Sequence, residues 1–211
     1  MIAGRSTHLR ILAINPGSTS TKVSLFNDTE ESESAAIQLT ADELAAYRNI
    51  IDQAPLREGT VRDFLLRHSV EPADLSAVIG RGGLMKPIKS GVYRVNGAMI
   101  EDLSSGRFGE HASNLGAVLA SRISDDAKCP AFIADPVVVD ELDPIARFSG
   151  IPEIERRSIF HALNQKSAAR EAAQKQGRRY EEMNLIVAHL GGGVSVGAHR
   201  NGRVVDVNNA L

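Results

Sequence analysis

The order of apolar and polar residues predicts short strands that alternate with helices. Residues 9–15 (LRILAIN) form an aliphatic run that ends at Pro16-Gly17, which is typical of a mostly buried strand. Residues 21–26 alternate polar and apolar positions and are followed by Asn27-Asp28, a turn pair. We therefore expect a hairpin with a loop of small residues, and residues 35–39 predict a third antiparallel strand.

Helix signals follow this predicted meander. Thr40 and Glu43 have the spacing of a capping box, and Leu44, Tyr47 and Ile51 would lie on one face of the helix that it starts. Further helices are predicted over residues 60–67, 96–103, 111–123 and 158–176, the last ending at Gly177, and further strands over 75–79, 92–95 and 130–134.

The C-terminal segment repeats the plan of the N-terminus. Residues 184–190 are an apolar run, a glycine triplet follows, and residues 194–199 and 203–207 read as strands joined by Asn201-Gly202, a type I′ turn signal. We interpret the two segments as an internal duplication in which each lobe opens with the same β-loop-β unit; two unrelated hairpins are the alternative. The apolar run at 184–190 predicts a central strand buried on both faces.

Composition excludes several classes of protein. The 211 residues suit one large domain or two small ones, and 24 Lys+Arg against 26 Asp+Glu leave no basic excess for nucleic acid. No apolar run approaches the roughly 20 residues of a membrane span, and the first ten residues lack the apolar core of a signal peptide. The single cysteine, Cys129, excludes an internal disulfide and suits a reducing cytoplasm.

Two loops have the chemistry of phosphate sites. Residues 15–22 (NPGSTSTK) combine an amide, a glycine, hydroxyls and a cation, and backbone N–H groups in such a tight turn can bind an anion. Residues 191–193 are all glycine, which lets a ligand approach the backbone. Each loop alone could be an ordinary surface turn, with Lys22 a solvated strand residue, but each opens one of the two repeats.

Five segments together resemble one family. Residues 11–26, 78–96, 132–150, 158–167 and 189–211 resemble, in order, the N-terminal part of butyrate kinases, within the acetate and butyrate kinase family and the actin, sugar-kinase and heat-shock ATPase (ASKHA) superfamily. The resemblance implies an α/β fold: an RNase H-like lobe with a mixed sheet, plus the first hairpin and meander of a second, incomplete lobe, with nucleotide between the lobes. The expected divisions are residues 1–134, a connecting segment 135–183 and the second lobe at 184–211.

The resemblance implies a cytoplasmic enzyme that transfers the γ-phosphoryl group of ATP to butyrate or a similar short-chain carboxylate, giving acyl phosphate and ADP with Mg²⁺. A carboxylate is already ionised at neutral pH, so the enzyme must mainly position two anions and stabilise charge on the moving group. Expected partners are the carboxylate and the acyl phosphate, without nucleic acid or membrane. Self-association as a homo-oligomer, or through an open sheet edge, is also expected.

Residue roles follow from the same resemblance. Phosphate or nucleotide binding is implied for the first loop, with Asn15 also near the metal, and for the second loop, where HLGGG replaces the HLGNG of acetate kinases and lacks an Asn contact. The implied binding residues are Asn15, Gly17, Ser18, Thr19, Ser20, Lys22, His189, Gly191, Gly192 and Gly193.

Three catalytic residues are implied. Arg81 would bind the carboxylate or a phosphoryl oxygen, Asp135 would orient water, metal or a cation, and the N–H or positive charge of His161 would meet phosphoryl oxygens. The alternatives are a surface-turn arginine, an Asp-Pro turn residue and a histidine on a helix face. His111 is left unassigned, as a helix cap or a packing residue.

The family's later elements have no counterpart before Leu211: the adenosine-binding segments, a second arginine and a metal-binding glutamate. We therefore expect a truncated form that is inactive alone. The alternatives are a short protein that binds phosphate or nucleotide without turnover, and a kinase of another ASKHA branch, such as a sugar kinase.

Overall fold

The structure is a computed structural model that describes residues 8–191 and 193–210. The chain divides into two compact units, which are treated separately below. Unit 1 contains the chain up to Met85 together with Val92–Ala134, and unit 2 contains Lys86–Gly91 and the chain from Asp135 onward. The division into residues 1–134, 135–183 and 184–211 stays a prediction.

Unit 1 is built on a mixed six-stranded sheet. Its strands lie in the order β3-β2-β1-β4-β6-β5, with β1, β2 and β3 antiparallel, β1, β4 and β6 parallel, and β5 antiparallel to β6. The predicted mixed sheet is confirmed. The strands are β1 (Arg10–Pro16), β2 (Ser20–Asn27), β3 (Glu30–Gln38), β4 (Ala77–Arg81), β5 (Val92–Arg94) and β6 (Ala131–Ala134).

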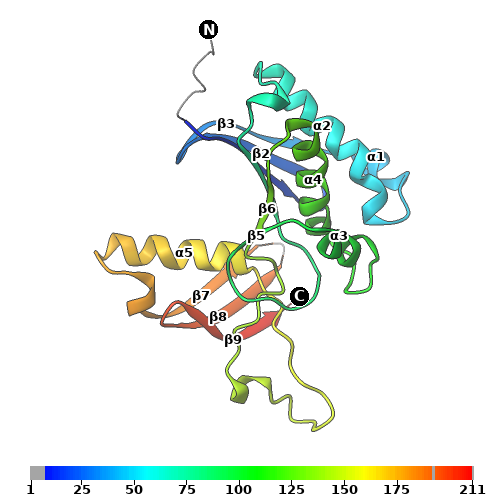
Figure 1. Cartoon of the computed structure of the whole chain (residues 1–211). Coiled ribbons are helices and arrows are strands. Elements are labelled where there is room, and N and C mark those ends of the chain that lie inside the picture. The colour runs from blue at the N-terminus through cyan, green and yellow to red at the C-terminus, as the bar shows by residue number, and fades with distance from the viewer. Residues whose placement is uncertain (1–7, 192, 211) are drawn as a thin grey trace. The chain divides into compact units, whose positions relative to one another are not determined.

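Helices α2 and α4 lie on the same side of this sheet (Figure 1). Every second residue of β1 and β2 points toward them, so Leu12, Ile14, Val23 and Leu25 are buried while their neighbours are not. The helical segments of unit 1 are α1 (Ala41–Ala45), η1 (Ile50–Gln53), α2 (Ala54–Arg67), η2 (Pro72–Asp74), α3 (Gly97–Ser104), η3 (Ala112–Asn114) and α4 (Leu115–Ala127).

The C-terminal end of β4 lies directly against α4, backbone to backbone. A Cβ atom at Gly80 would sit 2.1 Å from the carbonyl oxygen of Gly116, and a Cβ at Gly116 would sit 2.1 Å from that of Arg81. Only glycine fits at either position. This close approach explains Gly80 and Gly116 without reference to a ligand.

Several predictions for unit 1 are confirmed at the level of single bonds. The Glu43 N–H donates to Thr40 Oγ1 at 3.2 Å, the Thr40 N–H donates to Glu43 Oε2 at 2.7 Å, and Asn96 caps α3. The single helix expected from Leu44 to Ile51 is wrong. Helix α1 ends at Ala45, and Asn49 and Asp52 start a separate 3₁₀ turn that caps itself.

Unit 2 contains an antiparallel meander, β7 (Asn184–Leu190), β8 (Val194–Arg200) and β9 (Arg203–Ala210), with helix α5 (Ala162–Lys175) beside it (Figure 1). The short turns η4 (Pro144–Arg147) and η5 (Tyr180–Glu182) complete it. Asn201 and Gly202 have φ values of 50° and 79°, as the predicted type I′ turn requires. Both predicted β-loop-β units are therefore present, although their origin by duplication stays a prediction.

Two predictions for unit 2 are wrong. Strand β7 was expected to be buried on both faces, but Ile186 and Leu190 are 74% and 77% exposed. The open sheet edge that was also expected is present, because β7 is an edge strand within the described residues. An unbroken apolar run does not tell a strand buried on both faces from an edge strand. The last helix begins at Ala162 and not at Ser158. The residues before it bond to the segment after β6: the Ser158 hydroxyl donates to the Val139 carbonyl at 2.6 Å, and the Phe160 N–H donates to the Val137 carbonyl at 3.1 Å.

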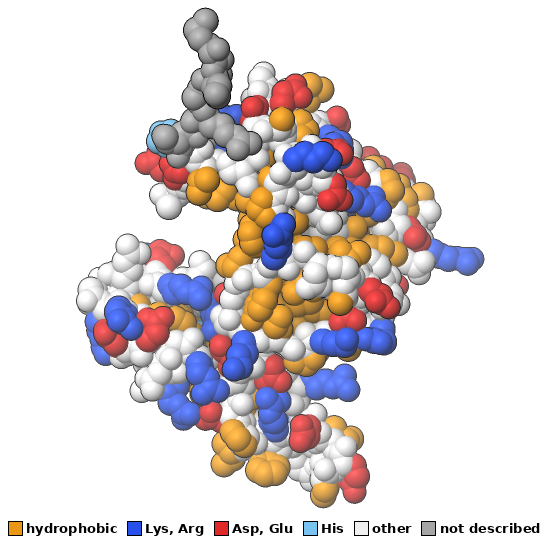
Figure 2. Space-filling model, in the orientation of Figure 1, with side chains coloured by type: hydrophobic (Ala, Val, Ile, Leu, Met, Phe, Trp, Pro, Cys, Tyr) orange, Lys and Arg blue, Asp and Glu red, His pale blue; other side chains and the backbone are white. Residues whose placement is uncertain are grey.

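The segment 144–155 carries exposed hydrophobic side chains. Ile145, Phe148, Ile151 and Ile154 are all more than half exposed. Hydrophobic side chains gather at the lower end of Figure 2, where this segment lies in Figure 1. None of the helices that the structure describes combines the length and apolar character needed to cross a membrane.

Candidate functional site

The first predicted phosphate loop is a tight turn whose carbonyl groups point into unit 1. The Gly17 N–H donates to the Ser20 carbonyl at 2.8 Å, and the Thr19 carbonyl accepts from the Leu39 N–H at 2.9 Å. Pro16 and Thr21 pair across the mouth of the turn. Because these carbonyl oxygens are engaged inside the unit, the exposed side of the turn is left to hydroxyl and N–H groups.

Arg57 of helix α2 holds this loop from behind. Its guanidinium donates to the Ser18 carbonyl at 3.2 Å, the Ser20 carbonyl at 3.0 Å and Thr21 Oγ1 at 3.1 Å. Two further bonds reach Gln53 Oε1, at 3.1 and 2.9 Å. Arg57 is completely buried, and this burial lowers the pKa of its guanidinium. A buried cation therefore lies directly beneath the exposed turn.

The exposed side of the loop presents donors that have no partner among the residues that the structure describes. Asn15 and Lys22 are cross-strand partners and thus share one face of the sheet. Both are exposed, as are Ser18 and Thr19. Among the described residues, the side chains of these four residues make no hydrogen bond or ion pair. The turn can therefore donate several hydrogen bonds and one positive charge to an anion.

Arg81 ends strand β4, opposite Ala134 of β6. Its side chain is partly buried, and desolvation lowers the pKa of the guanidinium. Within the part of the chain that the structure describes, it makes no hydrogen bond and no salt bridge with a carboxylate. A half-buried cation without an anionic partner is unfavourable, so this position suits an anionic ligand.

His111 lies near Arg81 and caps the turn η3. Its Nδ1 accepts a hydrogen bond from the Ser113 N–H at 3.2 Å, which is the cap role considered from the sequence. Burial, and then the charge of Arg81, lower the pKa of His111. The imidazole is therefore neutral at neutral pH.

Asp135 is a buried carboxylate held by three partners in unit 2. The Ser90 hydroxyl and the Gly91 N–H donate to its Oδ1 at 2.6 and 2.8 Å, and Arg170 lies 3.6 Å from its Oδ2. Its φ of 32° is in the left-handed region that a non-glycine residue rarely adopts. Such strain often marks a functional position, and the carboxylate is anchored rather than mobile.

Two histidines from separate predicted motifs meet in unit 2. The rings of His161 and His189 stack with centroids 3.8 Å apart and planes 14° apart. His189 Nδ1 lies 2.8 Å from Asn164 Oδ1, and His161 Nδ1 lies 2.8 Å from Ser195 Oγ. His189 and Ser195 are themselves cross-strand partners in the second hairpin, in the place that Asn15 and Lys22 occupy in the first.

The glycine loop beside this pair is only partly described. The Gly191 N–H donates to the Gly193 carbonyl at 3.2 Å, which closes the turn between β7 and β8. Gly192, a predicted binding residue, lies outside the described residues. A Cβ at Gly191 would approach His189 Nε2 to 3.0 Å, so the loop and the histidine are in close contact.

Sequence reasoning missed several residues around these groups. Gln165 follows His161 by four positions, which is one turn of a helix, and Ser195 and His199 are separated by an even number of strand positions. Both spacings are visible in the sequence and indicate residues that share one face of a helix or of a strand. Nothing in the sequence distinguished Arg57 from the other arginines of its helix.

The chain is similar to known carboxylate kinases. It is 52% identical to butyrate kinase 1 and to butyrate kinase 2 of Clostridium acetobutylicum over 202 residues, which is 96% of this chain and 57% of each relative. The chain thus spans little more than half the length of these relatives. Residues 152–211 match the model of the Acetokinase family. The predicted resemblance to butyrate kinases is confirmed.

Solved structures show the same fold. Acetate kinase of Porphyromonas gingivalis superposes with a TM-score of 0.68 at 15% identity, over 95% of this chain and 57% of that one. A propionate kinase of Francisella tularensis superposes with a TM-score of 0.66 at 18% identity, over the same shares. The predicted α/β fold class is confirmed.

Proposed function

We propose that this relative of the butyrate kinases takes part in reversible phosphoryl transfer between ATP and a short-chain carboxylate such as butyrate. In that reaction a carboxylate oxygen bonds to the γ-phosphorus, the bond from that phosphorus to the β,γ-bridging oxygen breaks, and acyl phosphate and ADP result. Because the chain spans 57% of its butyrate kinase relatives, the complete reaction is a proposal for this chain.

The observation that carries the proposal is the state of Arg81. A guanidinium that is desolvated, yet has no carboxylate partner among the described residues, needs an anion. Its planar fork matches the two oxygens of a carboxylate or a phosphoryl group. We therefore assign the carboxylate or the acyl phosphate to Arg81.

The first loop suits the phosphates of a nucleotide. Lys22 supplies a mobile charge, the exposed Ser18 and Thr19 supply donors, and Arg57 adds a buried positive charge beneath them. Gly17 and Ser20 close the turn through their own hydrogen bond. We propose that this loop binds ATP and ADP through phosphate oxygens.

In unit 2 we assign His161 to the transferring phosphoryl group and His189, with the adjoining glycines 191–193, to the nucleotide. The stacked rings are held by Asn164 and Ser195, so their positions are fixed before a ligand arrives. Asp135 is anchored by Ser90 and Gly91, and it fits an orienting role better than a proton-transfer role.

The donors in unit 1 fit a magnesium–nucleotide complex. Among the described residues no group of three or more His, Cys, Asp or Glu side chains could hold a metal ion. Mg²⁺ commonly takes most of its ligands from water and substrate phosphates, so the side-chain oxygen of the exposed Asn15 would hold the ion together with those phosphates. When bound, the ion would neutralise charge on the phosphates.

The proposed partners are thus ATP or ADP, Mg²⁺, a short-chain carboxylate and its acyl phosphate, in the cytoplasm. We also propose self-association, because the segment 144–155 and the edge of β7 expose hydrophobic side chains. Sedimentation velocity would show a single species of monomer mass, 22.7 kDa, at every concentration if this part of the proposal is wrong.

Binding of butyryl phosphate to the whole chain tests the proposal. We expect isothermal titration to show binding that Arg81→Met weakens at least about tenfold, as for loss of a bidentate charged contact worth roughly 1.5–3 kcal/mol. Arg94→Met, an exposed arginine on β5, serves as the control and leaves the affinity unchanged. Equal affinity of wild type and Arg81→Met would overturn the assignment. Trapping of acyl phosphate with hydroxylamine, from ATP, Mg²⁺ and butyrate, then measures turnover by the chain itself.

A further inference from the structure

We infer that a buried chain of hydrogen bonds from Tyr180 through His199, Gln165 and Ser195 sets the proton position on His161. This hydrogen-bond chain holds His161 as a neutral imidazole with its proton on Nε2. His161 is then a hydrogen-bond donor rather than a cation at the reacting phosphoryl group, and this last step rests on the proposed function.

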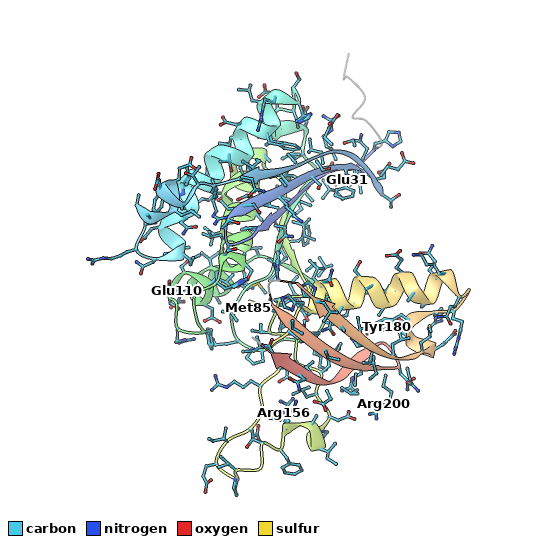
Figure 3. The ribbon with its side chains drawn as sticks, turned by 180° about the vertical axis from the view of Figure 1, so that it is seen from behind. Glu31, Met85, Glu110, Arg156, Tyr180 and Arg200 are labelled. Atoms are coloured by element: carbon cyan, nitrogen blue, oxygen red, sulfur yellow. The ribbon has the colours of Figure 1, made fainter. Side chains whose placement is uncertain are left out.

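The fold places these residues on facing surfaces. His161 and Gln165 lie one helical turn apart at the start of α5, and Ser195 and His199 lie on the same face of β8. Gln165 and Ser195 are completely buried, and His199 and Tyr180 are 2% and 4% exposed. Tyr180 lies between α5 and the strands of the sheet (Figure 3). Water therefore has little access to the hydrogen bonds between these residues.

The orientation of the Gln165 amide is fixed by a carbonyl group. One end of the amide lies 3.1 Å from the Ser195 carbonyl oxygen, which can only accept, so this end is the donor Nε2. The other end, Oε1, lies 3.1 Å from His199 Nε2. An amide oxygen can only accept, so His199 must have its proton on Nε2.

His199 is neutral, and Tyr180 donates to it. Burial, together with the nearby charge of Lys166, lowers the pKa of His199 to about 4. With the proton on Nε2, Nδ1 has a lone pair, which lies 2.7 Å from the Tyr180 hydroxyl. Burial raises the pKa of Tyr180, so its proton stays in place and forms this bond. Each of these hydrogen bonds thus has one donor and one acceptor.

Ser195 transmits this order to His161. Its hydroxyl oxygen accepts from Gln165 Nε2 at 2.9 Å and from the His161 backbone N–H at 3.3 Å. Both lone pairs are then used, and only the hydroxyl proton remains for His161 Nδ1, 2.8 Å away. A proton on Nδ1 would point at Ser195 Oγ, whose two lone pairs already accept the bonds from Gln165 and from the backbone. His161 therefore has its proton on Nε2.

Gly197 leaves the space in which Gln165 lies. A Cβ at this position would be 2.3 Å from Gln165 Oε1 and 3.0 Å from His199 Nε2. Its φ lies outside the left-handed region, so the backbone itself accepts alanine. Gly197→Ala is therefore a probe that displaces the Gln165 amide without removing any polar group.

Long-range ¹H–¹⁵N correlation spectra of the whole chain, without ligand at pH 7.5, test the inference. We expect His161 to show a protonated Nε2 and an unprotonated Nδ1 in wild type and in the control Ser167→Ala, an exposed position on α5. Ser195→Ala and Gly197→Ala should give a mixture of the two tautomers. A wild-type spectrum with the proton on Nδ1 or on both nitrogens would overturn the inference, as would an unchanged tautomer in a folded Ser195→Ala variant.

Addition of ligand separates the tautomer of His161 from its role in phosphoryl binding. Addition of butyryl phosphate should shift the His161 Nε2 resonance if this group meets phosphoryl oxygens. If the tautomer is as inferred but no shift occurs at saturating ligand, the hydrogen-bond chain stands and the role of His161 in phosphoryl binding does not. If wild type alone is folded, its spectrum still decides the tautomer.

Discussion

Replacing Arg57 by Met should destabilise unit 1 and loosen the phosphate loop. The substitution retains much of the apolar stem of the side chain but removes five hydrogen bonds, to Gln53, Thr21 and the carbonyl groups of Ser18 and Ser20. Replacing a buried charge by an apolar group is neutral only when its partners are replaced too. Here the partners remain, so the variant buries polar atoms that have lost their donor.

The loss of stability depends on which of these acceptors keep another hydrogen-bond partner in the variant. The Ser20 carbonyl still accepts from the Gly17 N–H, and Ser18 is exposed to water. Gln53 and Thr21 are buried, and their oxygens Oε1 and Oγ1 lose the hydrogen bonds that they accept from the Arg57 guanidinium. At about 1–3 kcal/mol for each buried group left unpaired, less some relief from no longer burying a charge, we expect a loss of about 3 kcal/mol. That is a large part of a typical stability of about 5–15 kcal/mol.

Denaturation with urea, and hydrogen exchange of the loop amides at residues 18–20, would measure both effects. Arg62→Met, on the same helix, is the matched control because its ion pairs with Glu58 and Asp126 are partly exposed and are worth at most about 1 kcal/mol. Arg57→Lys keeps the charge without the planar fork and should lie between wild type and Arg57→Met. Equal losses of stability in Arg57→Met and Arg62→Met, with equal exchange of the loop amides, would show that Arg57 does not hold the loop.

Two further predictions concern buried charge and pH. In wild type the Glu141 carboxylate lies 2.8 Å from the Lys166 ammonium group, so Lys166→Met leaves it without its cation and should cost about 3–5 kcal/mol of unfolding free energy. Lys175→Met, which removes an exposed ion pair within a helix, is the control and should cost under about 0.5 kcal/mol. Equal losses in urea denaturation would contradict this prediction. Because the pKa of His199 is lowered from its ordinary value near 6.5 to about 4, the unfolded chain binds a proton first as the pH falls. Stability is therefore intact above pH 6.5 and is lost progressively toward pH 4, by roughly 3 kcal/mol in all, and His199→Gln should remove this part of the pH dependence. Parallel stability profiles of wild type and His199→Gln between pH 7.5 and pH 4 would show that His199 is not the group responsible.

The sequence predicts the position of a strand more reliably than its burial or its neighbours in the sheet. The hairpin of β1 and β2 is marked at both ends by turn residues and in between by alternation, so its position and its pairing follow from local chemistry. The run at β7 has the right length, but its burial depends on which strands lie beside it, and that is a property of the whole sheet. Helix α5 starts later than expected, and Ser158 and Phe160 before it bond to Val139 and Val137, partners that no local pattern reveals.

The candidate site divides in the same way. Glycine, hydroxyl and lysine residues within one loop are visible in the sequence because they are adjacent. The stacking of His161 on His189 joins a helix to a strand far along the chain, and only the fold brings them together. The support of the loop by Arg57 is a long-range contact of the same kind, made by a residue type that is usually exposed.

We propose that each of the two units contains groups that bind the phosphates of a nucleotide. A titration of the whole chain with MgATP, followed by amide resonances of Ser18, Thr19 and Gly193 and the ring nitrogens of His161, tests it most directly. We predict that these resonances shift together in wild type and in the exposed control Lys128→Met, and that Lys22→Met needs at least about tenfold more ligand, as for loss of a charged phosphate contact. Unchanged Ser18 and Thr19 amides at millimolar MgATP would contradict the claim.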